Sequence, residues 1–227
     1  MSLEKIKERI HPNLYDALYK DGIKELRPAQ RKSIEAGLLE GKNLLVCTPT
    51  ASGKTLVAEL AMLNTILHHP GKKAVYIVPL KALASEKFRQ FKAKYSNLIK
   101  IALSIGDIDS SDPYLSNYDI IICTSEKFDS LIRHHARWLS SVSVVVVDEI
   151  HLLNDPGRGP TLEILITMLR EILKGLQIIA LSATIGNPKE LAEWLNAELV
   201  IDYWRPVKLQ KGVYVEDRGM IEFEKDA

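Results

Sequence analysis

Residues 44–58 read LLVCTPTASGKTLVA: a short apolar run, a loop of small and polar residues, and the start of an apolar helix. A strand, a tight loop and a helix in this order form the context that a phosphate-binding loop requires. Small residues at Ala51, Ser52 and Gly53, after Thr50, let backbone N–H groups approach phosphate oxygens, and the helix N-terminus adds partial positive charge. The stretch predicts a nucleotide site within an α/β fold.

Two side chains at the start of the predicted helix carry the chemistry of this loop. Lys54 is expected to place its charge near the β- and γ-phosphates of ATP, and Thr55 to offer its hydroxyl to Mg²⁺. The strict pattern begins with Gly, whereas Thr48 stands at that position here. The alternative is a chance Gly-Lys-Thr at a helix start, but the strand–loop–helix context favours an ATP site.

A second informative stretch, residues 144–151, reads VVVVDEIH. A buried strand that ends in two acids is costly unless the charges have partners, and ligands bind at this edge of open α/β sheets. Asp148 is predicted to hold Mg²⁺, directly or through water, and Glu149 to accept a proton from the attacking water. The alternative is an acidic helix cap. His151 is a candidate link to the next strand, although a lone His at a strand end is more often structural.

Apolar runs of this kind alternate with helical patterns along the chain. The runs are short and apolar throughout, as expected when both faces of a mainly parallel sheet are covered by helices. The predicted strands are 43–47, 74–78, 100–104, 119–123, 142–147, 177–181 and 198–201. The predicted helices are 3–10, 12–21, 28–39, 54–68, 80–95, 126–134, 161–173 and 188–195.

Composition excludes several classes of protein. Lys plus Arg number 30 and Asp plus Glu 29, so the net charge of +1 does not indicate a nucleic-acid partner. Cys47 and Cys123 lie outside any CxxC and are expected to be buried thiols, with no zinc or redox site. The N-terminus lacks the apolar segment of a signal peptide, and no apolar stretch reaches the ~18 residues of a membrane span. We expect a soluble, cytoplasmic monomer without a membrane partner.

The pattern changes after residue 203. Residues 209–215 and 220–223 alternate in polarity around 216–219, which predicts a β-hairpin. We therefore expect an ATP-binding domain at 1–203, including the short N-terminal helices, and a linker and hairpin at 204–227 that lead to a further domain.

A third motif identifies the class. Residues 178–184 read IIALSAT, and the phosphate-binding loop, Asp-Glu-Ile-His and Ser-Ala-Thr, in this order, resemble motifs I, II and III of superfamily 2 helicases. The resemblance runs from about Leu14 to Phe223 and is nearest to Ski-type DExH helicases, in particular the archaeal repair helicases. It implies a RecA-like motor domain in which Ser182, Ala183 and Thr184 couple nucleotide to nucleic acid.

Residues 27–30 (RPAQ) resemble the Q motif, which implies that Gln30 reads the adenine edge. Residues 79–83 (PLKAL), 106–107 (GD) and 124–127 (TSEK) resemble motifs Ia, Ib and Ic. Each follows a predicted strand, where backbone N–H groups can hold phosphates without reading sequence, although such turns are rich in small polar residues anyway. The candidate nucleic-acid contacts are Pro79, Leu80, Lys81, Gly106, Asp107, Thr124, Ser125, Lys127 and Arg158.

For Arg158, in a glycine-flanked loop, the sequence leaves three partners open: nucleic acid, a second domain, or Glu163. The resemblance implies an ATP-dependent DNA helicase that tracks single-stranded or forked DNA 3′ to 5′ in repair or recombination. It also implies a second RecA-like domain that supplies arginine fingers. An RNA helicase domain and a nucleotide-binding module that is nearly inactive alone are the alternatives. A small-substrate kinase is disfavoured by Asp148-Glu149 and residues 182–184.

Overall fold

Seven parallel strands form the central sheet, in the order β3-β4-β2-β5-β6-β1-β7. The computed structural model describes residues 1–106, 112–207, 212–216 and 219–222. All of the predicted strands are confirmed within a residue of their expected bounds. They are β1 (Leu44–Cys47), β2 (Lys73–Val78), β3 (Ile101–Ser104), β4 (Ile120–Thr124), β5 (Val142–Val147), β6 (Gln177–Ser182) and β7 (Glu198–Ile201).

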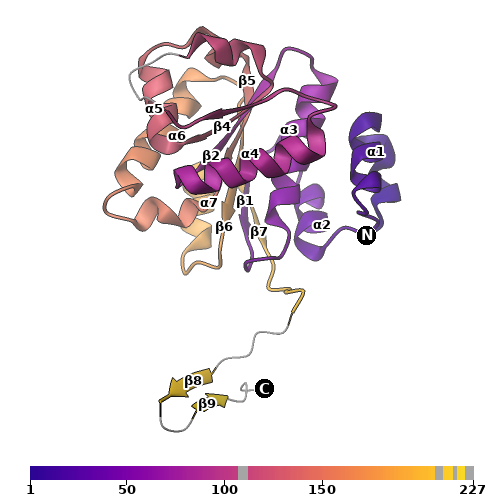
Figure 1. The fold of residues 1–227 in the computed structure, drawn as a ribbon, viewed down its shortest axis with the longest axis vertical. Helices are drawn as coiled ribbons and strands as arrows, with labels where there is room; N and C mark the ends of the chain where they lie inside the picture. Colours follow the sequence, from indigo (N-terminus) through magenta and orange to yellow (C-terminus); the bar gives the residue numbers. More distant parts are fainter. Residues whose placement is uncertain (107–111, 208–211, 217–218, 223–227) are drawn as a thin grey trace.

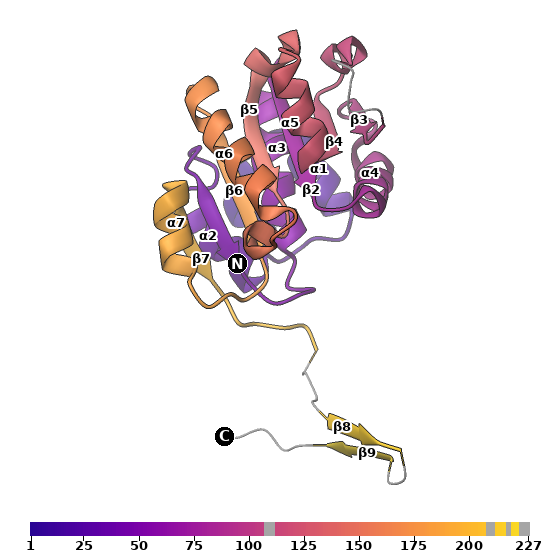
Figure 2. The same ribbon diagram turned by 90° about the vertical axis from the view of Figure 1, so that its left-hand side faces the viewer.

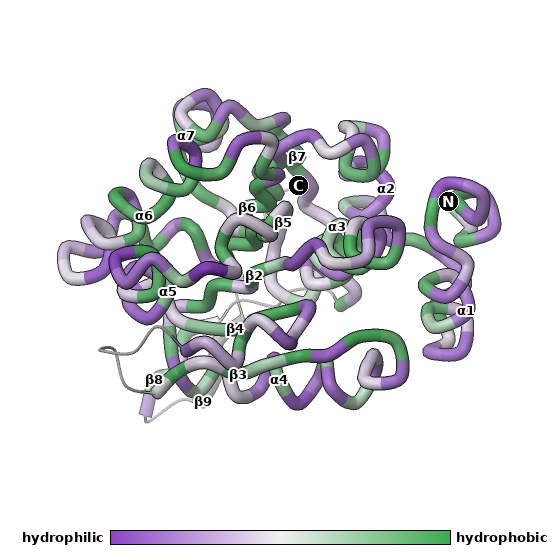
Figure 3. The backbone as a smooth tube through the Cα atoms, turned by 90° about the horizontal axis from the view of Figure 1, so that it is seen from above, coloured by the Kyte–Doolittle hydropathy of each residue, from purple (hydrophilic) through white to green (hydrophobic). Residues whose placement is uncertain are grey.

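Helices cover both faces of the sheet, which Figure 3 shows as a mainly green layer between them. One face is covered by α1 (Pro12–Lys20), α2 (Pro28–Glu35), α3 (Lys54–His68) and α4 (Lys81–Tyr95). The other is covered by α5 (Ser125–Arg133), α6 (Gly159–Ile172) and α7 (Pro188–Leu195). Short 3-10 helices are η1 (Leu3–Arg9), η2 (Pro113–Asn117), η3 (Arg137–Ser141) and η4 (Ile150–Asn154).

Burial on both faces of the sheet explains why β5 is apolar at every position and does not alternate in polarity. Val144 and Val146 pack into the core under α1 to α4, whereas Val145 and Val147 pack into the core under α5 to α7. Because successive strand residues point to opposite faces, a strand covered on both sides needs apolar residues at every position. Among the described residues, no helix combines the length and apolar character needed to cross a membrane.

Two predicted helices differ from the structure. The helix expected at 28–39 ends at Glu35, because Gly37 adopts φ +101 and Leu38 N–H donates to the Ser33 carbonyl 3.1 Å away. A left-handed glycine after the last turn is a common helix terminator. The segment expected as a helix at 3–10 is 3-10 rather than α-helical, since its Lys5 N–H bonds the carbonyl of Ser2 three residues before.

Tight glycine turns lie at the amino ends of three strands of the sheet. Gly41 comes before β1, Gly71 before β2 and Gly175 before β6, with φ between +74 and +92. A side-chain Cβ at any of them would meet open space. The phosphate-binding loop and residues 148–151 lie at the opposite edge, where the strands end.

The predicted C-terminal hairpin is present as β8 (Gly212–Val215) paired antiparallel with β9 (Gly219–Glu222). It lies apart from the seven-stranded sheet in Figure 1 and Figure 2. Residues 209–211 and 223, which were also expected in this hairpin, lie outside the described residues. Both cysteines are free and buried, as expected, and burial raises the pKa of Cys47 to about 11.

Candidate active site

The three motif segments meet at the carboxyl ends of the parallel strands, because β5, β6 and β1 are neighbours in the sheet. This side of the sheet is called the nucleotide edge below. The phosphate-binding loop follows β1, residues 148–151 follow β5, and Ser182 ends β6. In the parallel register, Cys47 pairs with Ser182 and Val147 pairs with Ala180. Segments that are far apart in sequence therefore form one continuous rim, as open α/β sheets do at the carboxyl ends of their strands.

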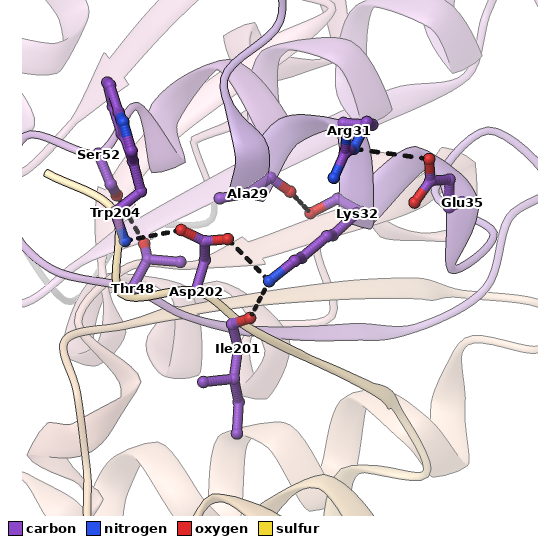
Figure 4. Close-up of polar contacts among 10 residues, drawn as sticks. Ala29, Arg31, Lys32, Glu35, Thr48, Ser52, Ile201, Asp202 and Trp204 are labelled. Atoms are coloured by element: carbon purple, nitrogen blue, oxygen red, sulfur yellow. Dashed lines mark hydrogen bonds and ion pairs between the residues drawn. The ribbon is translucent and has the colours of Figure 1, made fainter. Parts of the chain in front are cut away.

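Hydrogen bonds inside the phosphate-binding loop account for Thr48, the departure from the strict pattern. Its buried hydroxyl lies 2.7 Å from the Ser52 hydroxyl, and both residues are drawn in Figure 4. Its backbone N–H donates to the Ser182 carbonyl 3.2 Å away. Ala51 adopts φ +64 and Gly53 φ +93, so the loop turns through the left-handed region twice. Thr48 thus closes the loop on itself and joins it to β6.

Gln30 and Arg27 support this loop from outside. The Gln30 amide Nε2 donates to the Gly53 carbonyl at 3.0 Å, and its Oε1 accepts the Arg27 N–H at 2.8 Å. Arg27 Nη1 donates to the Ala51 carbonyl at 2.7 Å. Gln30 is 3% exposed, so the structure assigns its side chain to holding the loop. Adenine reading by Gln30 stays a prediction.

Gly53 has no room for a side chain without displacement of its neighbours. A Cβ built on it would lie 2.5 Å from Gln30 Nε2 and 3.1 Å from Arg27 Cδ. We expect Gly53→Ala to cost about 1–2 kcal/mol for its left-handed backbone, and in addition to displace Gln30 and weaken nucleotide binding. Gly41→Ala is the matched control, because φ is +79 there and nothing lies within 4 Å. Thermal unfolding and titration with ADP would compare them; equal loss of affinity in both would contradict this role for Gly53.

Asp148 and Glu149 follow β5 at a sharp turn. Asp148 Oδ2 accepts a hydrogen bond from the Tyr76 hydroxyl at 2.8 Å, and Oδ1 accepts one from the Glu149 N–H at 3.0 Å. Glu149 has φ +53, a left-handed conformation that is uncommon outside glycine and occurs at functional sites. His151 Nδ1 lies 3.3 Å from Glu149 Oε2. The turn therefore separates the roles of the two acids: one carboxylate is held in place, and the other is half-buried beside an imidazole.

Thr55 and Asp148 supply the kind of oxygen ligands that suit Mg²⁺. Thr55 is the second residue of α3, and its hydroxyl accepts a hydrogen bond from Lys87 Nζ at 3.0 Å. Magnesium proteins commonly provide one or two carboxylates and leave the other positions to phosphate and water oxygens. Within the described part of the chain, no three His, Cys, Asp or Glu side chains gather as a metal cage. One hydroxyl and one carboxylate at this edge fit a metal bound together with nucleotide.

Three of these contacts come from residues that sequence reasoning did not assign: Arg27, Tyr76 and Lys87. A detectable signal existed for Tyr76, because a tyrosine inside an apolar strand needs a partner for its hydroxyl. Arg27 belongs to the Q-like segment, whose resemblance points to Gln30 and not to the arginine. For Lys87, one of several charged residues on α4, we find no signal in the sequence.

The predicted nucleic-acid segments follow β2, β3 and β4, which are neighbours, so they line the other half of the same edge. Leu80 is 43% exposed and Lys81 is also exposed. Thr124 is buried, and its hydroxyl accepts the Lys127 N–H as the N-cap of α5. Pro79 is half-buried, Gly106 exposed and Ser125 buried, while Asp107 lies outside the described residues.

Lys127 is placed differently from its prediction. Its side chain is 2% exposed, and Nζ lies 2.9 Å from Asp112 Oδ2, so it does not present its charge at the surface. The physical reason is its position on α5, next to Phe128, on the side that faces the core. A buried cation requires a paired anion, which Asp112 provides. Lys127 therefore anchors the chain near residue 112.

Arg158 lines a cleft together with Asp148, Glu149, Pro79 and Ser125. The cleft joins the acidic turn after β5 to the segments that follow β2 and β4. A contact of Arg158 with nucleic acid stays a prediction. The Arg158 backbone N–H is held by Asp155 Oδ1 at 2.9 Å.

The chain leaves β7 through an ionic contact between a buried carboxylate and a half-exposed lysine, drawn in Figure 4. Asp202 Oδ2 lies 2.8 Å from Lys32 Nζ, and Oδ1 accepts the Trp204 N–H at 2.8 Å. Arg27 lies 5.5 Å from the centre of the Trp204 ring. Burial alone would raise the pKa of Asp202, but the hydrogen bonds from Lys32 and Trp204 outweigh it, and the pKa is lowered. The exit of the chain is thus fastened to α2.

We expect Asp202→Asn to destabilise the fold by about 0.5–1.5 kcal/mol at pH 7, because the neutral amide loses the ionic contact to Lys32, whose half-exposed ammonium can still be hydrated. A lowered folded pKa gives stability that is present above the unfolded value of about 3.9 and is lost as the pH falls through the folded value. The difference between wild type and variant should therefore shrink below about pH 3.9. Urea unfolding at several pH values measures this.

Glu198→Gln is the control for that experiment. Glu198 Oε1 pairs with Lys42 Nζ at 2.9 Å, but both side chains are more than half exposed. Such a surface pair contributes about 0–1 kcal/mol. A difference between wild type and Asp202→Asn that does not change with pH would contradict the ionic role of Asp202.

Comparison with known proteins places this geometry in context. The profile of the DEAD/DEAH box helicases matches residues 27–191. The ATP-dependent DNA helicase Hel308 of Methanococcus vannielii is 55% identical over 211 residues, which cover 90% of this chain and 28% of that protein. Hel308 of Methanocaldococcus jannaschii is 59% identical over 208 residues, covering 89% of this chain and 17% of that protein.

Solved helicase structures resemble this fold as well. The DUF1998 helicase MrfA bound to DNA and AMPPNP superposes with a TM-score of 0.73 and 30% identity, covering 86% of this chain and 29% of that one. MrfA bound to DNA alone gives a TM-score of 0.72 at 28% identity. The chain thus spans less than a third of the length of these relatives.

Proposed function

Because this chain belongs to the DEAD/DEAH box helicase family, we propose that it is the ATP-binding and ATP-hydrolysing motor domain of an ATP-dependent DNA helicase. Its fold is that of a RecA-like helicase domain. The observation that carries the proposal is the meeting of the phosphate-binding loop, Asp148-Glu149 and Ser182 at the ends of β1, β5 and β6. The names of the Hel308 relatives, and the DNA bound to MrfA, favour DNA over the RNA alternative.

The proposed mechanism assigns each group one task. Backbone N–H groups of residues 50–53 and the Lys54 ammonium hold the phosphates, while Thr55 and Asp148 would hold Mg²⁺. When bound, the metal supplies charge neutralisation at the phosphate oxygens. Glu149 accepts a proton from the attacking water, which strengthens the water as a nucleophile. Arginine fingers from a second domain would complete the charge stabilisation.

Coupling to DNA is proposed to run along the same edge of the sheet. The Ser182 carbonyl holds the Thr48 N–H, so a change in the phosphate-binding loop reaches β6 directly. Ala183 and Thr184 continue from that point toward the surface. His151 beside Glu149 links the proton acceptor to η4. These contacts support a role for residues 182–184 and His151 in coupling.

For the intact protein, we propose tracking of single-stranded or forked DNA from 3′ to 5′, in repair or recombination. The second RecA-like domain would follow the exit at Trp204, beyond the 1–203 unit. A monomeric state and a cytoplasmic location belong to the same proposal.

The test is ATP hydrolysis by this chain, measured alone, with single-stranded DNA and with single-stranded RNA. DNA-stimulated turnover supports the proposal, and stronger stimulation by RNA supports the RNA helicase alternative. Retained Mg·ATP binding without turnover supports the module that is nearly inactive until its second domain is present. Absence of both binding and turnover in a folded sample would reject the proposal.

A further inference from the structure

Tyr76 is a buried tyrosine in the middle of the sheet whose hydroxyl reaches the acidic turn. It lies on β2, next to β5, and pairs in register with Val146, two residues before Asp148. Its side chain is fully buried, and its ring packs edge-on against Phe91 of α4 with centroids 5.4 Å apart. A hydroxyl in such surroundings has few directions in which to donate, and it donates to Asp148 Oδ2 at 2.8 Å.

Two hydrogen bonds from different parts of the chain fix the Asp148 carboxylate. Tyr76 holds Oδ2 from the neighbouring strand, and the Glu149 N–H holds Oδ1 from the turn. The Asp148 backbone N–H is held as well, by the Ile77 carbonyl at 2.9 Å. An ionised carboxylate has about four acceptor positions, so each oxygen keeps a free lone pair after these bonds. The carboxylate is therefore oriented and still able to bind a metal or its water.

We propose that Tyr76 is a positioning residue for the magnesium site, which acts by fixing the orientation of Asp148 from β2. The inference rests on the proposed function, because it takes Asp148 as the metal-site acid. Hydrogen-bond partners of metal ligands typically change metal affinity ~10- to 100-fold when removed.

The chain contains a matched control for this contact. Tyr95 of α4 is also buried, and its hydroxyl donates to a buried carboxylate, Glu59 Oε2, at 2.6 Å. Its ring packs against the same Phe91, with centroids 6.3 Å apart. Glu59 lies on α3 and pairs with Lys94, not with the acidic turn. Tyr95→Phe thus removes the same atom from a similar environment without touching Asp148.

The experiment compares wild type, Tyr76→Phe and Tyr95→Phe by calorimetric titration with AMPPNP, once with Mg²⁺ and once with EDTA. The dissociation constant in EDTA divided by the dissociation constant in Mg²⁺ measures how much magnesium strengthens binding. We expect this ratio to fall ~10- to 100-fold in Tyr76→Phe, and to stay within about twofold of wild type in Tyr95→Phe. Thermal unfolding of each variant shows how much fold stability the two substitutions cost.

A double-mutant cycle separates action through Asp148 from a general loosening of the fold. If Tyr76 acts through Asp148, then Tyr76→Phe should leave the ratio unchanged once Asp148→Asn is present. An unchanged ratio in Tyr76→Phe alone would overturn the inference and leave the proposed function standing. An equal fall in Tyr95→Phe would overturn it as well, because the effect would then be structural. Wild type that binds AMPPNP equally with Mg²⁺ and with EDTA would overturn the inference, whereas a folded wild type that binds no AMPPNP under either condition would count against the proposed function as well.

Discussion

Replacement of Glu149 by Gln is expected to lower ATP turnover ~10²- to 10⁴-fold while leaving Mg·ATP binding close to that of wild type. The amide keeps the size and shape of the side chain but cannot accept the proton of the attacking water. Glu149 is suited to that task because it is half-buried at a left-handed turn, with φ +53, directly after the carboxylate that Tyr76 and its own N–H hold. Steady-state hydrolysis with single-stranded DNA, together with nucleotide titration, separates the two effects.

Glu171→Gln is the control for this substitution, since Glu171 is an exposed acid on α6, away from the sheet edge. It should hydrolyse ATP at the wild-type rate. If Glu149→Gln also hydrolysed ATP at that rate, Glu149 would not be the proton acceptor. Loss of binding in Glu149→Gln would instead indicate that the residue holds the site together.

The second large effect is expected for Lys54→Ala, which should weaken Mg·ATP binding ~10- to 100-fold or more. The reason is that the ammonium is the only full positive charge within residues 48–55, and its contacts to phosphate are charge-assisted. Fluorescence titration with a labelled ATP analogue would measure the loss.

Lys174→Ala serves as the comparison, because Lys174 is exposed just before β6, at the edge where the strands begin. It should bind nucleotide as wild type does. Wild-type affinity in Lys54→Ala would show that the loop 48–55 does not bind the phosphates in the proposed way.

The strands and the order of the motifs could be predicted from sequence because they depend on local patterns. Apolar runs without alternation indicate strands covered on both faces, and β5 fulfils this with four consecutive valines. The end of α2 was missed because apolar residues continue to Leu39, whereas the left-handed Gly37 decides where the helix stops. One backbone conformation thus outweighed the apolar pattern.

The contacts that refine the site could not be predicted in the same way. Tyr76 and Asp148 are 72 residues apart, and Lys87 and Thr55 are 32 apart, so these contacts exist only once β2, β5, α3 and α4 are assembled. The burial of Lys127 was not predicted for a different reason. A lysine is usually exposed, and its burial depends on the distant partner Asp112.

The glycine turns before β1, β2 and β6 have a practical consequence for handling this domain. Gly41, Gly71 and Gly175 have open space around them and lie at the opposite edge of the sheet from the catalytic groups. Exposed turns of this kind are the preferred places for inserted segments. A dye, a surface tether or a short peptide tag introduced next to one of these glycines would leave the nucleotide edge unobstructed. The glycine turns are therefore suitable attachment points for optical trapping or for assays on an immobilised protein.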